Sequence, residues 1–237
     1  MMETRELRAT GAGERRDRDR ELVRLIGRHG AMSLEQVMRA MGAGRTATYR
    51  RFARCEEAGL VERLRILGSG PAVLHATREG LRYAGLGLPV AAISPGGVDH
   101  MLRCTSLAIR IEQLHPDRCV FTEREIVLEE SIRGKALASV AVGRFRGRPK
   151  MHRADLLVES EGSEGEKFLV PFEVELTPKA PARLRTIIAA WANAARAGRF
   201  PLVYYFCEPG QACRAVERAV AKVGAGDKIA IAKVMPR

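Results

Sequence analysis

Apolar residues recur at helical spacing in the first part of the chain, in segments separated by glycine. Residues 19–30, DRELVRLIGRHG, gather their apolar side chains on one helix face, and Gly30 lies where a C-cap belongs. Ser33 is followed three residues later by Gln36, which is the spacing of a capping box. A second helix is therefore expected over residues 33–41.

A third helix is expected over residues 45–59, RTATYRRFARCEEAG. Its apolar members, Tyr49, Phe52 and Cys55, are predicted to face the core, and Gly59 is predicted to end it.

After this helix the period changes from helical to alternating. Residues 60–67 (LVERLRIL) and 72–77 (AVLHAT) predict two strands, with a turn at GSGP between them and a short helix over 78–86 after them. Three helices, a hairpin and a closing helix predict a winged helix-turn-helix, whose wing would run from Arg65 to Pro71.

The second half of the chain follows a different order. Its expected elements are a helix over 98–115, strands over 118–128, 152–160 and 168–176, a helix over 180–198, a strand over 201–208, a helix over 210–224 and a strand over 228–234. This order predicts an α/β domain with a central mixed sheet. The intervening basic segment, 129–151, fits no single period, so its conformation is left open.

These elements divide the chain into four predicted parts. Residues 1–18, rich in Arg, Glu, Asp and Gly, are expected to be a disordered basic lead-in. The winged helix-turn-helix is assigned to residues 19–86, a linker containing Pro and Gly to 87–97, and the α/β domain to 98–237.

The net charge of the chain indicates a class of binding partner. The formal net charge is +12, which favours a polyanion such as nucleic acid over a neutral partner, the alternative being basic charge dispersed over the surface. No apolar run is long enough for a bilayer, and the N-terminus lacks the apolar core of a signal peptide. Five cysteines without a C-x-x-C pair predict free thiols in a reducing cytoplasm.

In a winged helix-turn-helix the third helix enters the major groove of double-stranded DNA. Outward side chains of arginine and threonine suit phosphates and base edges. Here they are predicted to be Thr46, Thr48 and Arg50 near the bases, Arg51 and Arg54 near the backbone, and Arg45 beside them. The alternative is a winged helix used for protein contact or dimerisation, with a solvated arginine face.

The apolar stretch VPFEVEL, residues 170–176, places Glu173 and Glu175 on the same face of a strand. Asp155 precedes them on the neighbouring predicted strand. Like charges this close raise each other's pKa unless a cation lies between them, and a Mg²⁺ ion with oxygen ligands is a natural partner. The alternative is an exposed edge strand whose glutamates are solvated or paired with Arg183 and Arg185.

These motifs resemble the PD-(D/E)XK nuclease superfamily, whose core runs helix, three strands, helix, strand. RAD at 153–155 would supply Asp155 as a metal ligand, EVE at 173–175 would supply Glu173, and Glu112 would match the glutamate of the leading helix. Together with the winged helix, the chain resembles the replication-relaxation family of plasmids and integrative elements, over roughly residues 19–225.

The chain departs from that pattern at one position. The superfamily's lysine should occupy position 175, where this sequence has glutamate. Lys179 is a candidate replacement, His152 a candidate proton shuttle, and Arg153 a candidate phosphate ligand. The resemblance therefore implies a nuclease-like domain whose activity is left open.

The sequence patterns are consistent with three functions. The first is a DNA-binding protein of a mobile element, with a nuclease-like domain that need not cleave. The second is an active Mg²⁺-dependent endonuclease or nickase using Asp155, Glu173 and Glu112. The third is a dimeric transcriptional repressor. The open segment carries a set of cations for either a DNA-touching loop or a solvated insertion: Arg133, Lys135, Arg144, Arg146, Arg148 and Lys150.

Overall fold

The computed structural model describes residues 3–66, 72–162 and 165–232. The chain divides into two compact units, Met1–Thr105 and Ser106–Arg237, and each is described by itself. The division falls inside helix α5 (Val98–Leu114), not in the predicted linker at 87–97. The predicted α/β class is confirmed, because helices accompany a five-stranded mixed sheet.

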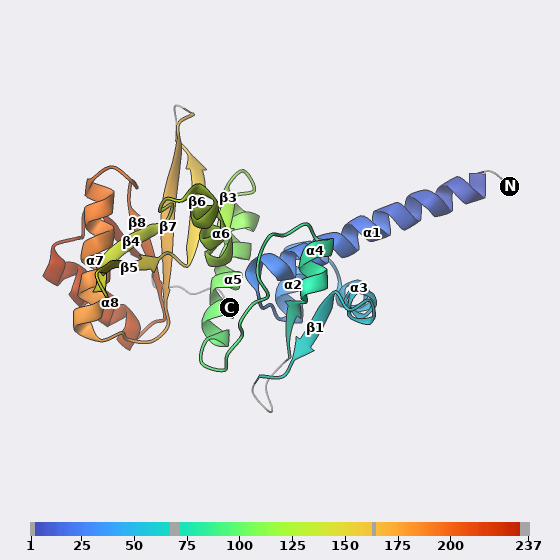
Figure 1. Cartoon of the computed structure of the whole chain (residues 1–237), viewed down its shortest axis with the longest axis horizontal. Helices are drawn as coiled ribbons and strands as arrows, with labels where there is room; N and C mark the ends of the chain where they lie inside the picture. Colours follow the sequence, from blue (N-terminus) through green and yellow to red (C-terminus); the bar gives the residue numbers. More distant parts are fainter. Residues whose placement is uncertain (1–2, 67–71, 163–164, 233–237) are drawn as a thin grey trace. The chain divides into compact units, whose positions relative to one another are not determined.

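Unit 1 opens with one long helix, α1 (Glu3–His29), whose N-terminal half extends away from α2, α3 and α4 (Figure 1). The predicted disordered lead-in at 1–18 is therefore helical from Glu3 onward. Arginine, glutamate and alanine are good helix formers, and extending a helix that has already nucleated costs little per added residue. The helix ends where expected, with Gly30 at a φ of 80°.

Two further helices and a hairpin follow in the predicted order. The Ser33–Gln36 capping box that starts α2 (Leu34–Met41) is confirmed. The remaining elements of the unit are α3 (Arg45–Glu57), β1 (Val61–Leu64), β2 (Val73–Ala76) and α4 (Arg78–Tyr83). β1 and β2 pair antiparallel, and Met32, between α1 and α2, bridges to Leu74. Residues 67–71, the greater part of the predicted wing, lie outside the described residues.

One prediction about the α3 core is wrong. Phe52 and Cys55 are buried as expected, but Tyr49 is 47% exposed. The buried stripe instead runs through Thr48, Phe52 and Cys55, at the i, i+4, i+7 spacing of a helix face. Tyr49 lies one residue, or about 100°, off that stripe.

Unit 2 is built on one sheet, with strands in the order β3-β6-β7-β8-β9. Their bounds are Cys119–Thr122, Leu156–Glu161, Lys167–Glu175, Val203–Cys207 and Ile229–Ala232. β6 pairs antiparallel with both β3 and β7, whereas β7, β8 and β9 are parallel to one another. Strand β7 therefore lies at the centre of the sheet. The end of the last predicted strand, at 233–234, lies outside the described residues.

Two segments between β3 and β6 differ from the expectations. The strand predicted over 118–128 stops at Thr122, where a capping box with Glu125 starts helix α6 (Glu123–Arg133). The segment left open becomes a separate hairpin of β4 (Ser139–Phe145) and β5 (Arg148–Arg153).

The core of unit 2 lies between the sheet and helices α7 (Pro181–Arg196) and α8 (Gln211–Val223), which pack against each other (Figure 1). The predicted face of α7 is confirmed: Leu184, Ile187, Ile188 and Trp191 are all buried. They share one cluster with Ile126 of α6 and with side chains from β6, β8 and β9. This core surrounds the face of β7 that carries its two glutamates.

Candidate functional site

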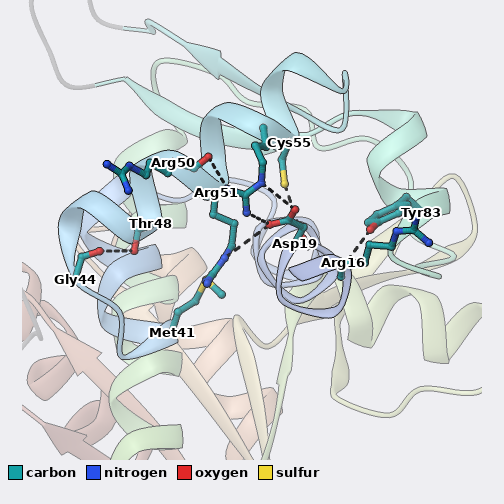
Figure 2. Close-up of polar contacts among 10 residues, drawn as sticks. Arg16, Asp19, Met41, Gly44, Thr48, Arg50, Arg51, Cys55 and Tyr83 are labelled. Carbon is teal, nitrogen blue, oxygen red and sulfur yellow. Dashed lines mark hydrogen bonds and ion pairs between the residues drawn. The ribbon is translucent and has the colours of Figure 1, made fainter. Parts of the chain in front are cut away.

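The outward face of α3 is basic. Arg45, Thr46 and Arg50 are exposed, as predicted for a helix that reads DNA. Neither Arg45 nor Arg50 pairs with a carboxylate in the part of the chain that the structure describes. Figure 2 shows the Arg50 side chain directed away from α1 and from the polar contacts around Asp19. Both guanidinium groups are therefore available to an anionic partner.

Thr48 does not belong to this face, contrary to the sequence prediction. It is fully buried, and its hydroxyl donates to the carbonyl of Gly44 at 3.1 Å (Figure 2). A threonine can replace an apolar core residue in a helix because this bond satisfies its hydroxyl group. Thr48 therefore belongs to the buried face of α3 and not to its outward face.

Arg51 and Arg54, predicted to contact the DNA backbone, join α3 to α1 through Asp19. Arg54 donates to both carboxylate oxygens of Asp19, at 3.3 and 2.7 Å, and the Nε of Arg51 lies 3.8 Å from Oδ1 (Figure 2). The hydrogen bond to Asp19 raises the pKa of the Arg54 guanidinium. A bidentate pair of this kind fixes orientation as well as distance. The two arginines hold the helix while Arg45 and Arg50 stay exposed.

Further contacts around α1 fix the same frame. The thiol of Cys55 lies 3.9 Å from the carbonyl oxygen of Asp19, and the Tyr83 hydroxyl donates to the carbonyl of Arg16 at 3.3 Å (Figure 2). The Nε of Arg20 in turn donates to the carbonyl of Tyr83 at 3.2 Å. Helix α1 thus connects α3 and α4 through polar contacts along one stretch of its length.

Strand β1 supports the exposed tyrosine of α3. Arg63 donates to the Tyr49 hydroxyl at 3.2 Å and to both oxygens of Glu56. Its guanidinium also lies over the rings of Tyr49 and Phe52. These contacts hold Tyr49 in place although its ring is half-exposed.

The second predicted site, in unit 2, is a buried acidic cluster. Glu173 and Glu175 are each 2% exposed on the central strand β7, so the exposed edge-strand alternative is wrong. Their partners are also not the predicted Arg183 and Arg185, which are exposed. A buried carboxylate needs hydrogen bonds or a countercharge, and both are supplied from nearby elements.

Glu173 receives two side-chain hydrogen bonds at the same oxygen, Oε1. The indole nitrogen of Trp191 donates to it at 2.9 Å, and Nε2 of His152 lies at the same distance. Burial raises the pKa of Glu173, while the hydrogen bond from His152 opposes that shift. Burial lowers the pKa of His152, but the bond to Glu173 and its charge outweigh this effect and the pKa is raised. His152 therefore acts as the partner of Glu173.

The other two predicted carboxylates have partners of their own. Asp155 accepts a hydrogen bond from the backbone nitrogen of Val174 at 2.7 Å, which ties the start of β6 to β7. Lys179, predicted as the displaced catalytic lysine, forms a salt bridge with Glu175. Tyr205 lies on β8 opposite Glu173 of β7 and is 1% exposed, and its hydroxyl makes no hydrogen bond to the described residues. Burial and the three nearby carboxylates raise the pKa of Tyr205.

The structure also places the remaining predicted site residues, Glu112 and Arg153. Among the described residues, the carboxylates of Glu112, Asp155 and Glu173 do not gather within 4.8 Å of one another, as a shared metal site would require. Arg153, predicted to hold a phosphate, donates to Glu130 at 3.0 Å. Glu130 also accepts from the Ser139 hydroxyl and from two backbone nitrogens, and these bonds, against the effect of burial, lower its pKa.

Three residues that shape these sites were not predicted. In the sequence, Asp19 is one of many charged residues near the N-terminus, and the apolar patterns around Trp191 and Tyr205 indicate only that both are core residues. The available signal was the isolated tryptophan on the apolar face of a helix that follows an acidic strand, because a buried indole needs an acceptor.

No protein-family model matches the sequence, and no curated protein matches it. Within the residues that the structure describes, no helix combines the length and the apolar character needed to cross a bilayer.

Proposed function

We propose that this protein binds double-stranded DNA, with α3 as the helix that enters the major groove. The observation that carries the proposal is the exposed Arg45–Thr46–Arg50 face, whose two arginines have no carboxylate partner among the described residues. Arg45 and Arg50 suit phosphates and guanine edges, and Thr46 suits phosphate or a thymine methyl group. The net charge of +12 favours the same partner.

The order of elements supports this assignment. Three helices, a two-stranded hairpin and a short helix follow one another in unit 1, as in winged helix-turn-helix proteins. From residue 98 onward, helix α5, strands β3, β6 and β7, helix α7 and strand β8 occur in the order of the PD-(D/E)XK core, with α6 and the β4–β5 hairpin inserted. A relation to the replication-relaxation family would make the target DNA part of a plasmid or an integrative element.

The acidic cluster favours binding over cleavage. Glu173 is held by His152 and Trp191, and Glu175 by Lys179, so the two buried carboxylates of the cluster already have internal partners. A catalytic Mg²⁺ ion keeps sites for water and phosphate, which a buried, internally paired cluster does not offer. We therefore assign the cluster to the stability of unit 2.

Fluorescence anisotropy with a labelled duplex library tests the proposal. The protein should bind at low salt with a log–log salt slope that grows by about 0.9 for each phosphate contacted. Arg50→Gln should cost about 1–3 kcal/mol of binding free energy and relax sequence preference, whereas Arg45→Gln should reduce the salt slope by about 1. Supercoiled plasmid should stay intact with Mg²⁺.

Arg78→Gln is the matched control, because Arg78 is an exposed arginine on α4, which packs against α1 and β2. Equal losses for Arg78→Gln and Arg50→Gln would remove α3 from the interface. Absence of binding to any duplex at low salt would remove the proposal altogether.

A further inference from the structure

The β4–β5 hairpin of unit 2 carries a dense group of exposed positive charge. Four cations, Arg144, Arg146, Arg148 and Lys150, fall within seven residues, all exposed. Among the described residues none of the four has a carboxylate partner. We propose that this hairpin is a second DNA contact, which holds the phosphodiester backbone with these cations and places Phe145 against the bases.

The hairpin arranges these side chains on a defined frame. Phe145 pairs with Arg148, and Arg144 with Pro149, so facing residues on the two strands project to the same side. Arg148 and Lys150 alternate with Pro149 and therefore share one face with Phe145. The extra residue between Ala141 and Arg144 is a β-bulge, which increases the twist of the ribbon. A twisted two-stranded ribbon is an element that fits a DNA groove.

Phe145 gives the basic surface an aromatic component. Phe145 is 67% exposed, and the guanidinium of Arg146 lies 5.4 Å from the centroid of its ring. Phe145, Arg146, Arg148, Pro149 and Lys150 line an open hollow on the hairpin surface. An exposed aromatic ring among guanidinium groups suits a base stacked beside its own phosphates. An acidic peptide would use the charges but would leave the ring without a partner.

The turn between β4 and β5 places an arginine in a backbone conformation that this residue type rarely adopts. Arg146 and Gly147 have φ values of 49° and 78°, as in a type I′ turn. Arg146 is the one non-glycine residue with positive φ among the described residues, and this conformation is unfavourable for an arginine because of its Cβ atom. Asparagine would adopt it more easily. The chain thus keeps a guanidinium at the tip against local backbone preference.

The inference rests on the proposed function, since it adds a second contact to the same DNA. The test compares the full-length protein with a variant in which Arg144, Arg146, Arg148 and Lys150 are all replaced by glutamine. Anisotropy with one duplex over a salt series should show affinity lowered at least tenfold at 0.1 M salt. The log–log slope should fall by about 0.9 for each lost phosphate contact.

A matched variant separates a local contact from a change of total charge. Arg185→Gln, Arg214→Gln, Arg218→Gln and Lys222→Gln together remove four exposed cations from α7 and α8. This variant should keep at least half of the wild-type affinity, and its log–log salt slope should equal that of the wild-type protein. Equal losses in the two quadruple variants would overturn the inference.

Comparison with the α3 variants distinguishes the two proposals. If the hairpin variant binds like wild type while Arg50→Gln loses affinity, the hairpin proposal fails and the α3 proposal stands. If only the hairpin variant loses affinity, α3 is the wrong element and the hairpin contact stands. A wild-type protein that binds no DNA contradicts both.

The strained turn supplies an independent readout. Arg146→Asn creates an Asn-Gly turn, so it should raise the melting temperature or leave it unchanged while lowering DNA affinity severalfold. A loss of affinity accompanied by a loss of folding would assign Arg146 a structural role instead.

Phe145→Ala should lower affinity for a duplex with an unpaired base at the contact more than for a fully paired duplex. Equal effects would remove Phe145 from base stacking.

Discussion

At the scale of single residues, the buried histidine at the end of α1 makes the stability of unit 1 depend on pH. His29 is 6% exposed, and burial, reinforced by the neighbouring charge of Arg28, lowers its pKa from 6.5 to about 3. Its ring nitrogen Nε2 has no hydrogen-bond partner in the described part of the chain. The folded protein therefore holds the ring neutral.

The unfolded chain takes up the His29 proton near pH 6.5, and the folded chain does so only near pH 3. Stability that is complete above pH 6.5 is therefore lost as the pH falls, by about 1.4 kcal/mol per pH unit. Urea unfolding followed by circular dichroism should show a loss of about 2 kcal/mol between pH 6.5 and pH 5 from this residue. His29→Gln should flatten that part of the profile, and an unchanged profile would rule out the assignment.

The pair Glu175 and Lys179 gives a second prediction at this scale. Glu175→Lys, which would restore the lysine of the nuclease pattern, places two ammonium groups together at a position that is 2% exposed. It should cost about 3–5 kcal/mol of unfolding free energy. Adding Lys179→Glu should recover part of this loss, as measured by denaturation with Trp191 fluorescence. A double variant no more stable than Glu175→Lys would show that the two side chains do not interact.

The sequence predicts which face of a helix is buried where the apolar pattern is regular, but it does not decide which of two adjacent residues faces the core. Thr48 and Tyr49 exchange their predicted places, because a 100° step decides which side chain faces the core. Polarity favours tyrosine inside and threonine outside. The carbonyl of Gly44 reverses that preference by accepting the threonine hydroxyl, and nothing in the sequence announces this bond.

At the scale of elements, the packing of α4 depends on one glycine. A Cβ atom added at Gly80 would lie 1.9 Å from the carbonyl oxygen of Leu60, which is a backbone atom. Gly80→Ala should therefore destabilise unit 1 by about 1–3 kcal/mol through overpacking, although alanine is favoured over glycine in a helix by about 1 kcal/mol. Arg78→Ala on the same helix is the control, and thermal unfolding by circular dichroism is the measurement. Equal stability of the two variants would contradict the close approach.

Elements with caps were easier to predict than elements defined by alternation alone. The Ser33–Gln36 box located α2, and the same signal at Thr122 and Glu125 was present in the sequence but was read as part of a strand. The segment TEREIVL, residues 122–128, has too few apolar residues to distinguish a helical period from the alternation of a strand. The capping box is therefore the better signal, and it indicates a helix. The β4–β5 hairpin could not be predicted because its turn uses arginine where asparagine or glycine is the usual signal.

At the scale of the whole molecule, the order of elements was readable but the pairing of side chains was not. The sequence was sufficient to predict helices and strands in an α/β arrangement and to place Asp155, directly before β6, beside the strand that carries Glu173. It did not reveal that Trp191, 18 residues after Glu173, would supply a hydrogen bond from α7. Such partners depend on how helices lie over the sheet, which local periodicity does not encode.

The thiols have different environments in the finished fold, with a practical consequence. Cys119 is exposed on the edge strand β3, Cys104 is half-buried, and Cys55, Cys207 and Cys213 are buried. Burial raises the pKa of Cys55 to about 11 and that of Cys207 to about 12, so both remain unreactive at neutral pH. A maleimide dye added briefly to the natural protein should couple first at Cys119, giving a site-selective label on unit 2 without any mutation.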